Sequence, residues 1–419
     1  MSGRADDARV RVVILGAGIV GLATAVRLLG EGHEVTLVER DEPGAATSRG
    51  NAAGIAWTDV APLASPGIWR KAPGWLLDPL GPLSLRLSHL PAFLPWMTRF
   101  LAASRPSAWR SSISAIAALN ALALPAWERM WSETGTGHRV RREGCLDVFD
   151  KPGEVVAARP GWDLQREHGI EVVEMTGAAM RDMEPDLGPG IAGGAFIPGW
   201  AHVDDPFELA RDLAGHARAR GARFVQAQAE GLVPSEGGVT VRLADGETLA
   251  AEKVVVACGA WSRKLTRALG EDVPLDTERG YNITVPEPGV SFRRFIMLAG
   301  YGFVLSPIAP GLRIGGAVEF AGLEAAPNWK RVDALVARAG RVVPGLRAEE
   351  GTRWMGFRPS LPDSLPVISV SGRTPHVIHA FGHAHHGLTQ AAATGEIVAG
   401  LIAGRPAPID LSPYSIGRF

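Results

Sequence analysis

The segment FGHAHHGLTQ, residues 381–390, places three imidazoles within four positions. Imidazole is a common zinc ligand and also the side chain that most often carries protons in catalysis. A zinc site, however, needs a fourth ligand and a geometry that three neighbouring side chains rarely supply by themselves. His383, His385 and His386 could therefore bind a metal, act in catalysis, or belong to a loop that serves another purpose.

Three further side chains could bind a small organic acid. Arg358 precedes a proline in GFRPSLPDSLPVI, residues 356–368, and a guanidinium can hold a carboxylate through two parallel hydrogen bonds. Tyr281 and Tyr301 are two of the three tyrosines in the chain, and either hydroxyl could donate to such a ligand. By themselves these residues indicate only a structural salt bridge and tyrosines satisfied by the backbone, so their meaning depends on the elements that position them.

A glycine-rich turn near the N-terminus is typical of phosphate binding. Residues 10–15, VRVVIL, form a β-branched run that predicts a buried parallel strand, and the run stops at a G-x-G-x-x-G motif. Gly16 permits the tight turn, Gly18 lets a pyrophosphate approach the backbone, and Gly21 lets helix and strand pack closely. The motif indicates a dinucleotide site, with a purely structural turn as the alternative.

The residues after this turn support a nucleotide site. A helix is expected from about Ile19 to Leu29, followed by a second strand, HEVTLVER, that ends near Glu39. The Glu39 carboxylate could accept hydrogen bonds from both ribose hydroxyls and would repel a 2′-phosphate, which favours FAD or NAD over NADP. The small and polar run TSRGNAAGIA, residues 47–56, could offer amides and hydroxyls to a flat heterocycle, or be an ordinary connection.

Composition and charge exclude several classes of protein. The 43 Lys and Arg nearly balance the 44 Asp and Glu, so no net field attracts nucleic acid. Cys145 and Cys258 are the only cysteines, which argues against a disulfide framework and a structural zinc and fits a reducing cytoplasm. The N-terminus lacks a secretory signal, and the longest weakly polar run, residues 113–127, is too short to span a bilayer. We therefore expect a cytoplasmic protein with a small-molecule partner.

Chain length and pattern predict two domains. Helix and strand patterns over residues 206–226 and 239–258 continue an αβ sheet, whereas the short strands between residues 280 and 320 are typical of an antiparallel sheet. Seven of the twelve tryptophans lie between residues 57 and 131. This Trp-rich segment could rest on a membrane or dock a partner. An ordinary core is favoured, because basic residues are not concentrated there.

Six motifs, in this order, resemble those of the FAD-dependent amino-acid oxidoreductases related to D-amino-acid oxidase and glycine oxidase, and especially the bacterial D-amino-acid dehydrogenases. They are VVILGAGIVGLATAVRLLGEGHEVTLVER, TSRGNAAGIA, HVDDPFELARDL, VVVACGAWS, GFRPSLPDSLPVI and FGHAHHGLTQAAATGEIVAGLIAGR. The resemblance covers nearly the whole chain. It implies an α/β fold in which a Rossmann-type FAD-binding domain, residues 1–85, 200–270 and 350–419, carries an inserted α+β substrate-binding domain with an antiparallel sheet, residues 86–199 and 271–349.

The resemblance also assigns the histidine-rich loop. In the family a G-H-x-x-x-G-x-T loop lies along the flavin, and His383, Gly387 and Thr389 fill the matching positions. Backbone amides near the start of the following helix would face the pyrimidine edge of the flavin and stabilise negative charge there. His385 and His386 occupy positions that vary in the family, and either could face the substrate; a metal is not expected.

Arg358 resembles the arginine that clamps the substrate carboxylate in this family, with Tyr281, Tyr301 and His385 as further candidate catalytic residues. No cysteine lies near the C-terminal flavin loop, so FAD is expected to bind non-covalently. The FAD-binding residues that the resemblance implies are spread over the chain: Gly16, Gly18, Ile19, Val20, Gly21, Glu39, Arg40, Thr47, Ser48, Asn51, Ala53, Gly54, Ile55, Leu232, Val233, Cys258, Gly259, Trp261, Arg358, Gly382, His383, His386, Gly387, Leu388 and Thr389.

The implied reaction is the oxidation of an amino or imino acid, most often a D-amino acid. Hydride would pass from Cα to flavin N5, and the imine would hydrolyse to a 2-oxo acid. The likeness to dehydrogenases favours a quinone or another acceptor, which the Trp-rich segment could meet at the inner face of the cell membrane. The alternatives are an oxidase that uses oxygen, acting on glycine, sarcosine or another N-substituted amino acid, and a non-catalytic FAD-binding scaffold. Neither the particular amino acid nor the oligomeric state follows from the sequence.

Overall fold

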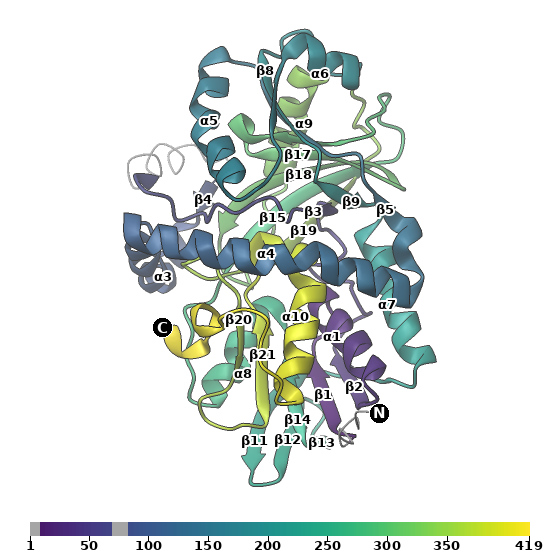
Figure 1. The fold of residues 1–419 in the computed structure, drawn as a ribbon, viewed down its shortest axis with the longest axis vertical. Helices are drawn as coiled ribbons and strands as arrows, with labels where there is room; N and C mark the ends of the chain where they lie inside the picture. Colours follow the sequence, from purple (N-terminus) through teal and green to yellow (C-terminus); the bar gives the residue numbers. More distant parts are fainter. Residues whose placement is uncertain (1–8, 69–82) are drawn as a thin grey trace, which may run out of the picture.

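The computed structural model describes residues 9–68 and 83–419. Two large sheets lie at opposite ends of an elongated molecule, and helix α4 (Pro106–Thr134) runs across the region between them (Figure 1). Within the described residues, no helix combines the length and the apolar character needed to cross a bilayer.

The lower sheet in Figure 1 has six strands among the described residues, in the order β10-β2-β1-β14-β21-β20, and β20 runs antiparallel to β21. The strands are β10 (Arg223–Gln226), β2 (Glu34–Glu39), β1 (Arg11–Leu15), β14 (Lys253–Val256), β21 (Val377–Phe381) and β20 (Val367–Val370). In β1, Val12 and Ile14 pack in a helical core, whereas Val13 and Leu15 pack in a second core on the other face. Burial on both faces explains why this strand is continuously apolar.

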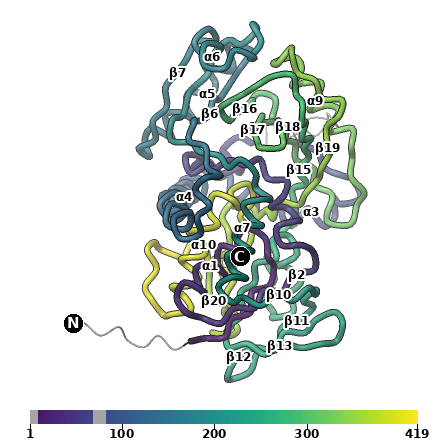
Figure 2. The backbone as a smooth tube through the Cα atoms, turned by 90° about the vertical axis from the view of Figure 1, so that its right-hand side faces the viewer, coloured from purple at the N-terminus to yellow at the C-terminus, as the bar shows by residue number. Residues whose placement is uncertain are grey.

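Different elements pack against the two faces of the lower sheet. Helices α1 (Ile19–Gly30) and α10 (Gly387–Ile402) lie side by side in both views, and α4 and α7 (Pro206–Ala219) pack against them (Figures 1 and 2). Gly395 permits this approach, because a Cβ there would lie 2.9 Å from the Ala23 carbonyl oxygen. The other face is covered by helix α8 (Ser262–Ala268) and by a small antiparallel sheet of β11 (Ala229–Ser235), β12 (Gly238–Leu243) and β13 (Thr248–Ala251).

The upper sheet is mixed and has nine strands within the described residues. The order is β19-β15-β18-β17-β16-β6-β8-β7, with β4 beside β18. The strands are β19 (Thr352–Ser360), β15 (Asp276–Val285), β18 (Gly311–Phe320), β17 (Phe303–Ile308), β16 (Phe295–Leu298), β6 (Cys145–Phe149), β8 (Gly193–Ile197), β7 (Val173–Thr176) and β4 (Leu83–Leu85). The antiparallel pairing of β15, β17, β18 and β19 confirms the sheet expected between residues 280 and 320.

Two boundaries of the expected domain division differ from the observed sheet membership. Both β19 and β4 belong to the upper sheet, although we expected residues from 350 onward and up to 85 in the FAD-binding domain. The reason is backbone hydrogen bonding, because β19 pairs along its length with the edge that β15 would otherwise expose. Helix α4, expected in the substrate-binding domain, instead packs against α10.

The remaining elements are short or peripheral. A small sheet joins β3 (Gly54–Ile55), β9 (Ala201–Val203) and β5 (Val140–Arg141). In the described part of the chain, the other helices are α3 (Leu90–Ala103), α5 (Pro152–Glu167), α6 (Gly177–Met183) and α9 (Lys330–Val342). Single 3-10 turns are η1 (Leu87–His89), η2 (Thr136–Arg139), η3 (Gly259–Trp261), η4 (Ala299–Tyr301), η5 (Ala384–His386), η6 (Ser412–Tyr414) and η7 (Ile416–Arg418).

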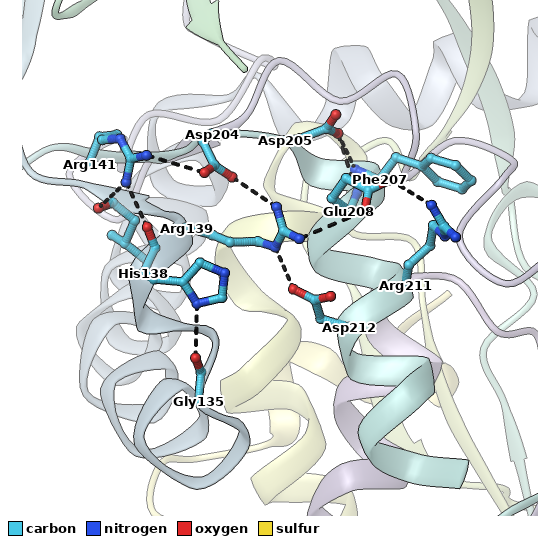
Figure 3. Close-up of polar contacts among 11 residues, drawn as sticks. Gly135, His138, Arg139, Arg141, Asp204, Asp205, Phe207, Glu208, Arg211 and Asp212 are labelled. Atoms are coloured by element: carbon cyan, nitrogen blue, oxygen red, sulfur yellow. Dashed lines mark hydrogen bonds and ion pairs between the residues drawn. The ribbon is translucent and has the colours of Figure 1, made fainter. Parts of the chain in front are cut away.

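Arg139 connects the end of α4 to the start of α7 (Figure 3). Its guanidinium contacts Asp204 at 3.4 Å and also donates to Asp212 in the second turn of α7. Asp205 caps α7 by accepting a hydrogen bond from the Phe207 N–H at 2.8 Å. These contacts fix the helical layer that carries one side of the candidate site.

The described part of the Trp-rich segment contributes strongly to the core. Trp127 and Trp131 stack with ring centroids 5.6 Å apart in the helical layer, and Trp96 of α3 is also buried. Trp69 and Trp75 lie outside the described residues. Burial of these rings supports the core interpretation of residues 96–131.

Candidate active site

A cavity of about 1260 Å³ opens between the two sheets. Its walls come from the turn between β1 and α1, the loop 47–56, the loop 380–388 and the strands β15, β18 and β19. The carboxyl ends of parallel strands meet here, which is where open α/β sheets bind ligands. The volume exceeds the range of about 300–1,000 Å³ that holds one drug-sized ligand, so a dinucleotide and a substrate have room.

Most of the predicted FAD-binding residues line this cavity. They are Gly16, Gly18, Ile19, Val20, Glu39, Arg40, Thr47, Ser48, Asn51, Gly54, Cys258, Gly259, Trp261, Arg358, Gly382, His383, His386, Gly387 and Leu388. The predicted residues that are not among its lining residues are Gly21, Ala53, Ile55, Leu232, Val233 and Thr389. Of this second group, Gly21 and Thr389 act through their neighbours, as described below.

Leu232 and Val233, predicted to contact FAD, are not among the residues that line the cavity. Both lie in β11 of the small covering sheet, where Leu232 is buried against β12 and Val233 is 47% exposed. The neighbouring residues that line the cavity are Ala227 and Gln228, which connect β10 to β11, and Ala229, the first residue of β11. We predicted the contact within the strand, and the structure lines the cavity with the connection before it and with its first residue.

The glycine turn is set by close packing. Gly16 has φ +98°, and a Cβ there would lie 2.5 Å from the Ala257 carbonyl oxygen. A Cβ on Gly21 would lie 2.0 Å from the Gly16 carbonyl oxygen, so Gly21 lets α1 begin directly against the turn. The Ile19 N–H donates to Ser48 Oγ at 3.0 Å, which ties the start of the helix to the loop 47–56.

Glu39 closes the nucleotide end of the cavity. One of its oxygens accepts from the Ala17 N–H and the other from the Arg40 N–H, both at 2.9 Å. The Arg40 guanidinium lies 3.9 Å from the centroid of the Trp261 ring, which makes a flat cationic wall. Burial, and then the charge of Glu39, raise the pKa of the Cys258 thiol to about 12, so this cysteine stays protonated.

The loop 47–56 is attached to the upper sheet through its carbonyls. Asn282 Nδ2 donates to the Gly50 carbonyl at 2.9 Å, and Ser306 Oγ donates to the Ala52 carbonyl at 2.7 Å. Arg313 Nη1 donates to the carbonyls of Arg49 and Asn51. Burial lowers the pKa of Arg313 to about 10, which still leaves it charged at neutral pH. The sequence analysis missed Arg313, because the carbonyls that it binds in the loop 47–56 lie more than 260 positions away.

The three histidines of the C-terminal loop have three different partners. His383 Nε2 lies 3.0 Å from Thr394 Oγ1, and His385 Nε2 lies 2.6 Å from Glu278 Oε2. His386 Nε2 is 3.9 Å from a carboxylate oxygen of Asp59. Among the described residues, no group of three or more His, Cys, Asp or Glu is arranged to hold a metal ion. The three histidines of the loop therefore act separately, each through its own contact.

Two further contacts hold this loop in place. Thr389 Oγ1 accepts from the Ala56 N–H at 2.9 Å, which joins the start of α10 to the loop 47–56. Trp127 Nε1 donates to the carbonyls of Leu388 and Thr389, both at 3.0 Å. These contacts explain why Thr389 matters although its side chain lies outside the cavity wall.

Acid is expected to destabilise the fold through His383. Burial, with a smaller effect of His386, lowers the pKa of His383 from 6.5 to about 3, so the folded state keeps it neutral. The unfolded chain takes up a proton first, so the stabilisation is complete above pH 6.5 and is lost as the pH falls, by at most about 5 kcal/mol at pH 3. Calorimetry of His383→Gln should therefore show a Tm that falls less steeply than that of the wild type below pH 6.5. Parallel curves would contradict this assignment.

Arg358 lies at the substrate end of the cavity. A Cβ on Gly280 would be 2.4 Å from Arg358 Cζ, so the guanidinium occupies space that only glycine leaves open. Arg358 Nη1 donates to the Ala317 carbonyl at 3.1 Å. Burial lowers the pKa of Arg358, while the charge of Glu278 opposes this shift. The guanidinium is thus held in a fixed position on the cavity wall.

Glu278, which the sequence analysis missed, lies directly opposite Arg358 in the register of β15 and β19. It is 1% exposed and lines the cavity together with Gly280 and Asn282. Alternate residues of a strand share one face, so the polar and small positions of TERGYNITV, residues 277–285, carried a signal for this face.

The two candidate tyrosines lie elsewhere. Tyr281 is among the cavity-lining residues, but its hydroxyl donates to Glu319 at 2.5 Å and its ring packs in the core beside α9. Tyr301 is not among the lining residues, and its hydroxyl donates to Asp150. The structure therefore does not bring either hydroxyl to Arg358. Tyr281 is an odd number of residues from Glu278 on β15, so its side chain leaves the strand on the other face, and Tyr301 lies on the turn η4.

Comparisons with known proteins agree with this arrangement. The family model described as DAO, FAD dependent oxidoreductase, matches residues 11–401. A D-amino-acid oxidase of Bradyrhizobium diazoefficiens is 39% identical over 97% of this chain and 98% of its own length. A D-amino acid dehydrogenase of Xanthobacter autotrophicus is 30% identical over 98% of this chain and 99% of its own length.

The chain belongs to the DAO family of FAD-dependent oxidoreductases. Its fold is also similar to that of a solved glycine oxidase from Geobacillus kaustophilus, with a TM-score of 0.72 and 23% identity over 98% of this chain and 99% of the other. Family membership confirms the expected resemblance, the fold class and FAD as the cofactor.

The residues of the DAO-family cavity fit FAD. Gly16, Gly18 and the start of α1 suit the pyrophosphate, and the fixed Glu39 carboxylate keeps lone pairs for ribose hydroxyls. Toward the other end, Gly387 at the start of the 16-residue helix α10 lines the cavity, and the nearby buried His386 Nδ1 has no hydrogen-bond partner among residues 9–68 and 83–419. An unpaired buried nitrogen is costly, so a ligand atom at this place is favoured.

Proposed function

We propose that the protein oxidises an amino acid to an imine, which hydrolyses to a 2-oxo acid, with the substrate carboxylate bound by Arg358. The observation that carries the proposal is a fixed guanidinium in the wall of the same cavity that receives the dinucleotide. The names of the D-amino-acid oxidase and the D-amino acid dehydrogenase support an amino acid as the substrate.

This chain contributes to the reaction by binding the substrate and fixing its orientation. Two parallel hydrogen bonds from a planar guanidinium would hold the carboxylate and fix the direction of the Cα–H bond. Orientation of this kind is worth about 7–11 kcal/mol of barrier. FAD, when bound, is the two-electron acceptor for the hydride that leaves Cα.

D-Amino acids are the proposed substrate class, because the relatives at 39% and 30% identity are both named for them. The glycine oxidase is only 23% identical, so it supports the fold and does not bear on the substrate. The candidate catalytic roles of Tyr281 and Tyr301 are not part of the proposal, since their hydroxyls bind carboxylates outside the Arg358 contact.

The proposal has an oxidase form and a dehydrogenase form, which differ in the electron acceptor. The 39% identical relative is named an oxidase, which favours oxygen, whereas the 30% identical relative is named a dehydrogenase, which favours a quinone or another acceptor. We give preference to oxygen because that relative is more similar. Contact of the Trp-rich segment with the inner face of a membrane would accompany the quinone form and stays a prediction.

Anaerobic mixing with amino acids tests the proposed function. We expect one or more D-amino acids in a panel of D-, L-, cyclic and N-alkyl amino acids to bleach the visible absorbance of the bound flavin. Admitting oxygen should then restore the colour and release one peroxide per amino acid oxidised in the oxidase form, whereas the dehydrogenase form would need an added quinone or dye. Retention of the colour with every member of the panel would favour a non-catalytic scaffold and refute the proposal.

A further inference from the structure

A histidine and carboxylate pair lies beside Arg358. His385, on the turn η5 before α10, places Nε2 2.6 Å from Oε2 of Glu278 on β15. The other oxygen of Glu278 accepts from Ser360 Oγ at 2.5 Å. Glu278 is 1% exposed, the His385 side chain is 38% exposed, and both line the cavity. With Nε2 engaged by a buried anion, Nδ1 is the ring nitrogen that can exchange a proton with a ligand.

The charges around this pair come from several elements. Glu278 on β15 faces Arg358 on β19, and His385 is followed in its own turn by His386, which lies 3.9 Å from Asp59. Burial opposes ionisation of Glu278, but the attraction and hydrogen bond of His385 and the charge of Arg358 outweigh it, so the pKa of Glu278 is lowered. Glu278 is therefore an anion that already balances Arg358. A substrate carboxylate adds a second anion, which favours one more cation at this place.

We propose that His385 accepts the proton that the substrate ammonium group loses before oxidation, and that Glu278 is the positioning residue that holds His385. The inference rests on the function proposed above. An N–H bond of the ammonium breaks and an Nδ1–H bond of His385 forms, so the substrate nitrogen keeps the electron pair and no oxidation occurs in this step. The imidazolium then lies between two anions, Glu278 and the substrate carboxylate. A buried carboxylate also orients a proton-accepting histidine in serine hydrolases, although there it binds Nδ1 and the proton is accepted at Nε2.

The pH dependence of flavin bleaching tests this role. With the fastest amino acid of the panel at saturation, the wild-type bleaching rate should fall as the pH drops, because an imidazole that already carries two protons cannot accept another. In His385→Gln the fall should begin at higher pH, where the substrate amine itself titrates. The rate near neutral pH should drop on the order of 10²-fold and recover toward the wild-type rate in alkali.

Removing the charge of Glu278 should shift the pH at which the bleaching rate falls in the opposite direction. Glu278→Gln keeps a hydrogen-bonding group beside His385 but no longer stabilises the imidazolium. The acid limb of the profile, which is the range in which the bleaching rate falls with decreasing pH, should therefore move to lower pH. The maximal rate should also fall, since a weaker base accepts a proton less readily.

A ligand without an amino group gives a second readout that involves no turnover. Propionate has the carboxylate of alanine but brings no proton, so its binding should draw a proton from solvent to His385. Its affinity, measured from the perturbation of the flavin spectrum, should fall as the pH rises, because protons become scarcer, and the binding reaction should take up protons in unbuffered solution. Both effects should be absent in His385→Gln.

The chain provides a control pair that also lines the cavity, in which the histidine lies on the turn η1 and its carboxylate partner lies on β15. His89 Nε2 lies 2.9 Å from Asp276, two residues before Glu278, and Asp276 pairs with Ser360 rather than with Arg358. His89→Gln should therefore leave the acid limb in place. An acid limb unchanged in His385→Gln, a rate lowered equally at every pH, or a limb that moves only in His89→Gln would overturn the inference. If no amino acid bleaches the wild-type flavin, the proposed function itself fails and the inference falls with it.

Discussion

Arg358→Ala is expected to lower kcat/KM for the amino acid by about 10³-fold while FAD stays bound. The substitution removes the cation for the substrate carboxylate and leaves the buried Glu278 with one cationic neighbour fewer. Truncating one partner of a buried, hydrogen-bonded charge pair in a complex, here the guanidinium and the substrate carboxylate, costs about 2–5 kcal/mol, and about 1.4 kcal/mol corresponds to tenfold. Steady-state kinetics give the loss, and the ratio of flavin to protein absorbance reports the cofactor.

Two companion variants sharpen this result. Arg353 lies on the same strand, but its 45% exposed side chain pairs with Asp333 at the surface, so Arg353→Ala should stay within about twofold of the wild type. Arg358→Lys keeps the charge and loses the planar fork, so its activity should lie between those of the wild type and Arg358→Ala. Near-normal kcat/KM of Arg358→Ala would refute the carboxylate assignment.

Gly21→Ala is expected to weaken FAD binding by about 10- to 100-fold. The new methyl group would lie 2.0 Å from the Gly16 carbonyl oxygen, so the turn and α1 must separate. This separation moves Gly18 and Ile19, which line the cavity at the phosphate end. Titration of the apoprotein with FAD, followed by flavin fluorescence, measures the affinity.

A glycine elsewhere serves as the control for Gly21→Ala. Gly400 lies near the end of α10, and a Cβ there would meet nothing within 4 Å. Gly400→Ala should therefore bind FAD normally and gain up to about 1 kcal/mol of stability from the better helix propensity. Circular dichroism of both apoproteins separates a local effect at the turn from loss of the fold, and an unchanged FAD affinity of Gly21→Ala would contradict the packing argument.

The nucleotide end was predictable because its determinants are local. Gly16, Gly18, Gly21 and Glu39 fall within one strand, helix and strand unit, and their spacing follows from the geometry of that unit. The observed α1 begins at Ile19 as expected and ends one residue beyond the predicted end. The hydrogen bonds and packing that shape the nucleotide end therefore join residues that are close in the sequence.

The substrate end could be predicted only in part. Arg358 was found through its motif, but Glu278 lies 80 positions earlier and becomes its neighbour only through the register of β15 and β19. The same register decides which face of β15 meets the cavity, and it turns the ring of Tyr281 toward α9. A shift of one residue would reverse both assignments. The alternation within residues 277–285 indicates which side chains share a face, but it does not say that Glu278 lies opposite Arg358.

The sequence by itself determined the family, the glycine turn with its acidic strand end, the histidine loop and the arginine before proline, because each is a contiguous motif with its own local geometry. The tertiary structure decided what the histidines contact, which strand joins which sheet, and that Glu278 stands between Arg358 and His385. The physical reason is that pairing between distant strands fixes these contacts, and the energy of a buried charge depends on all the groups around it.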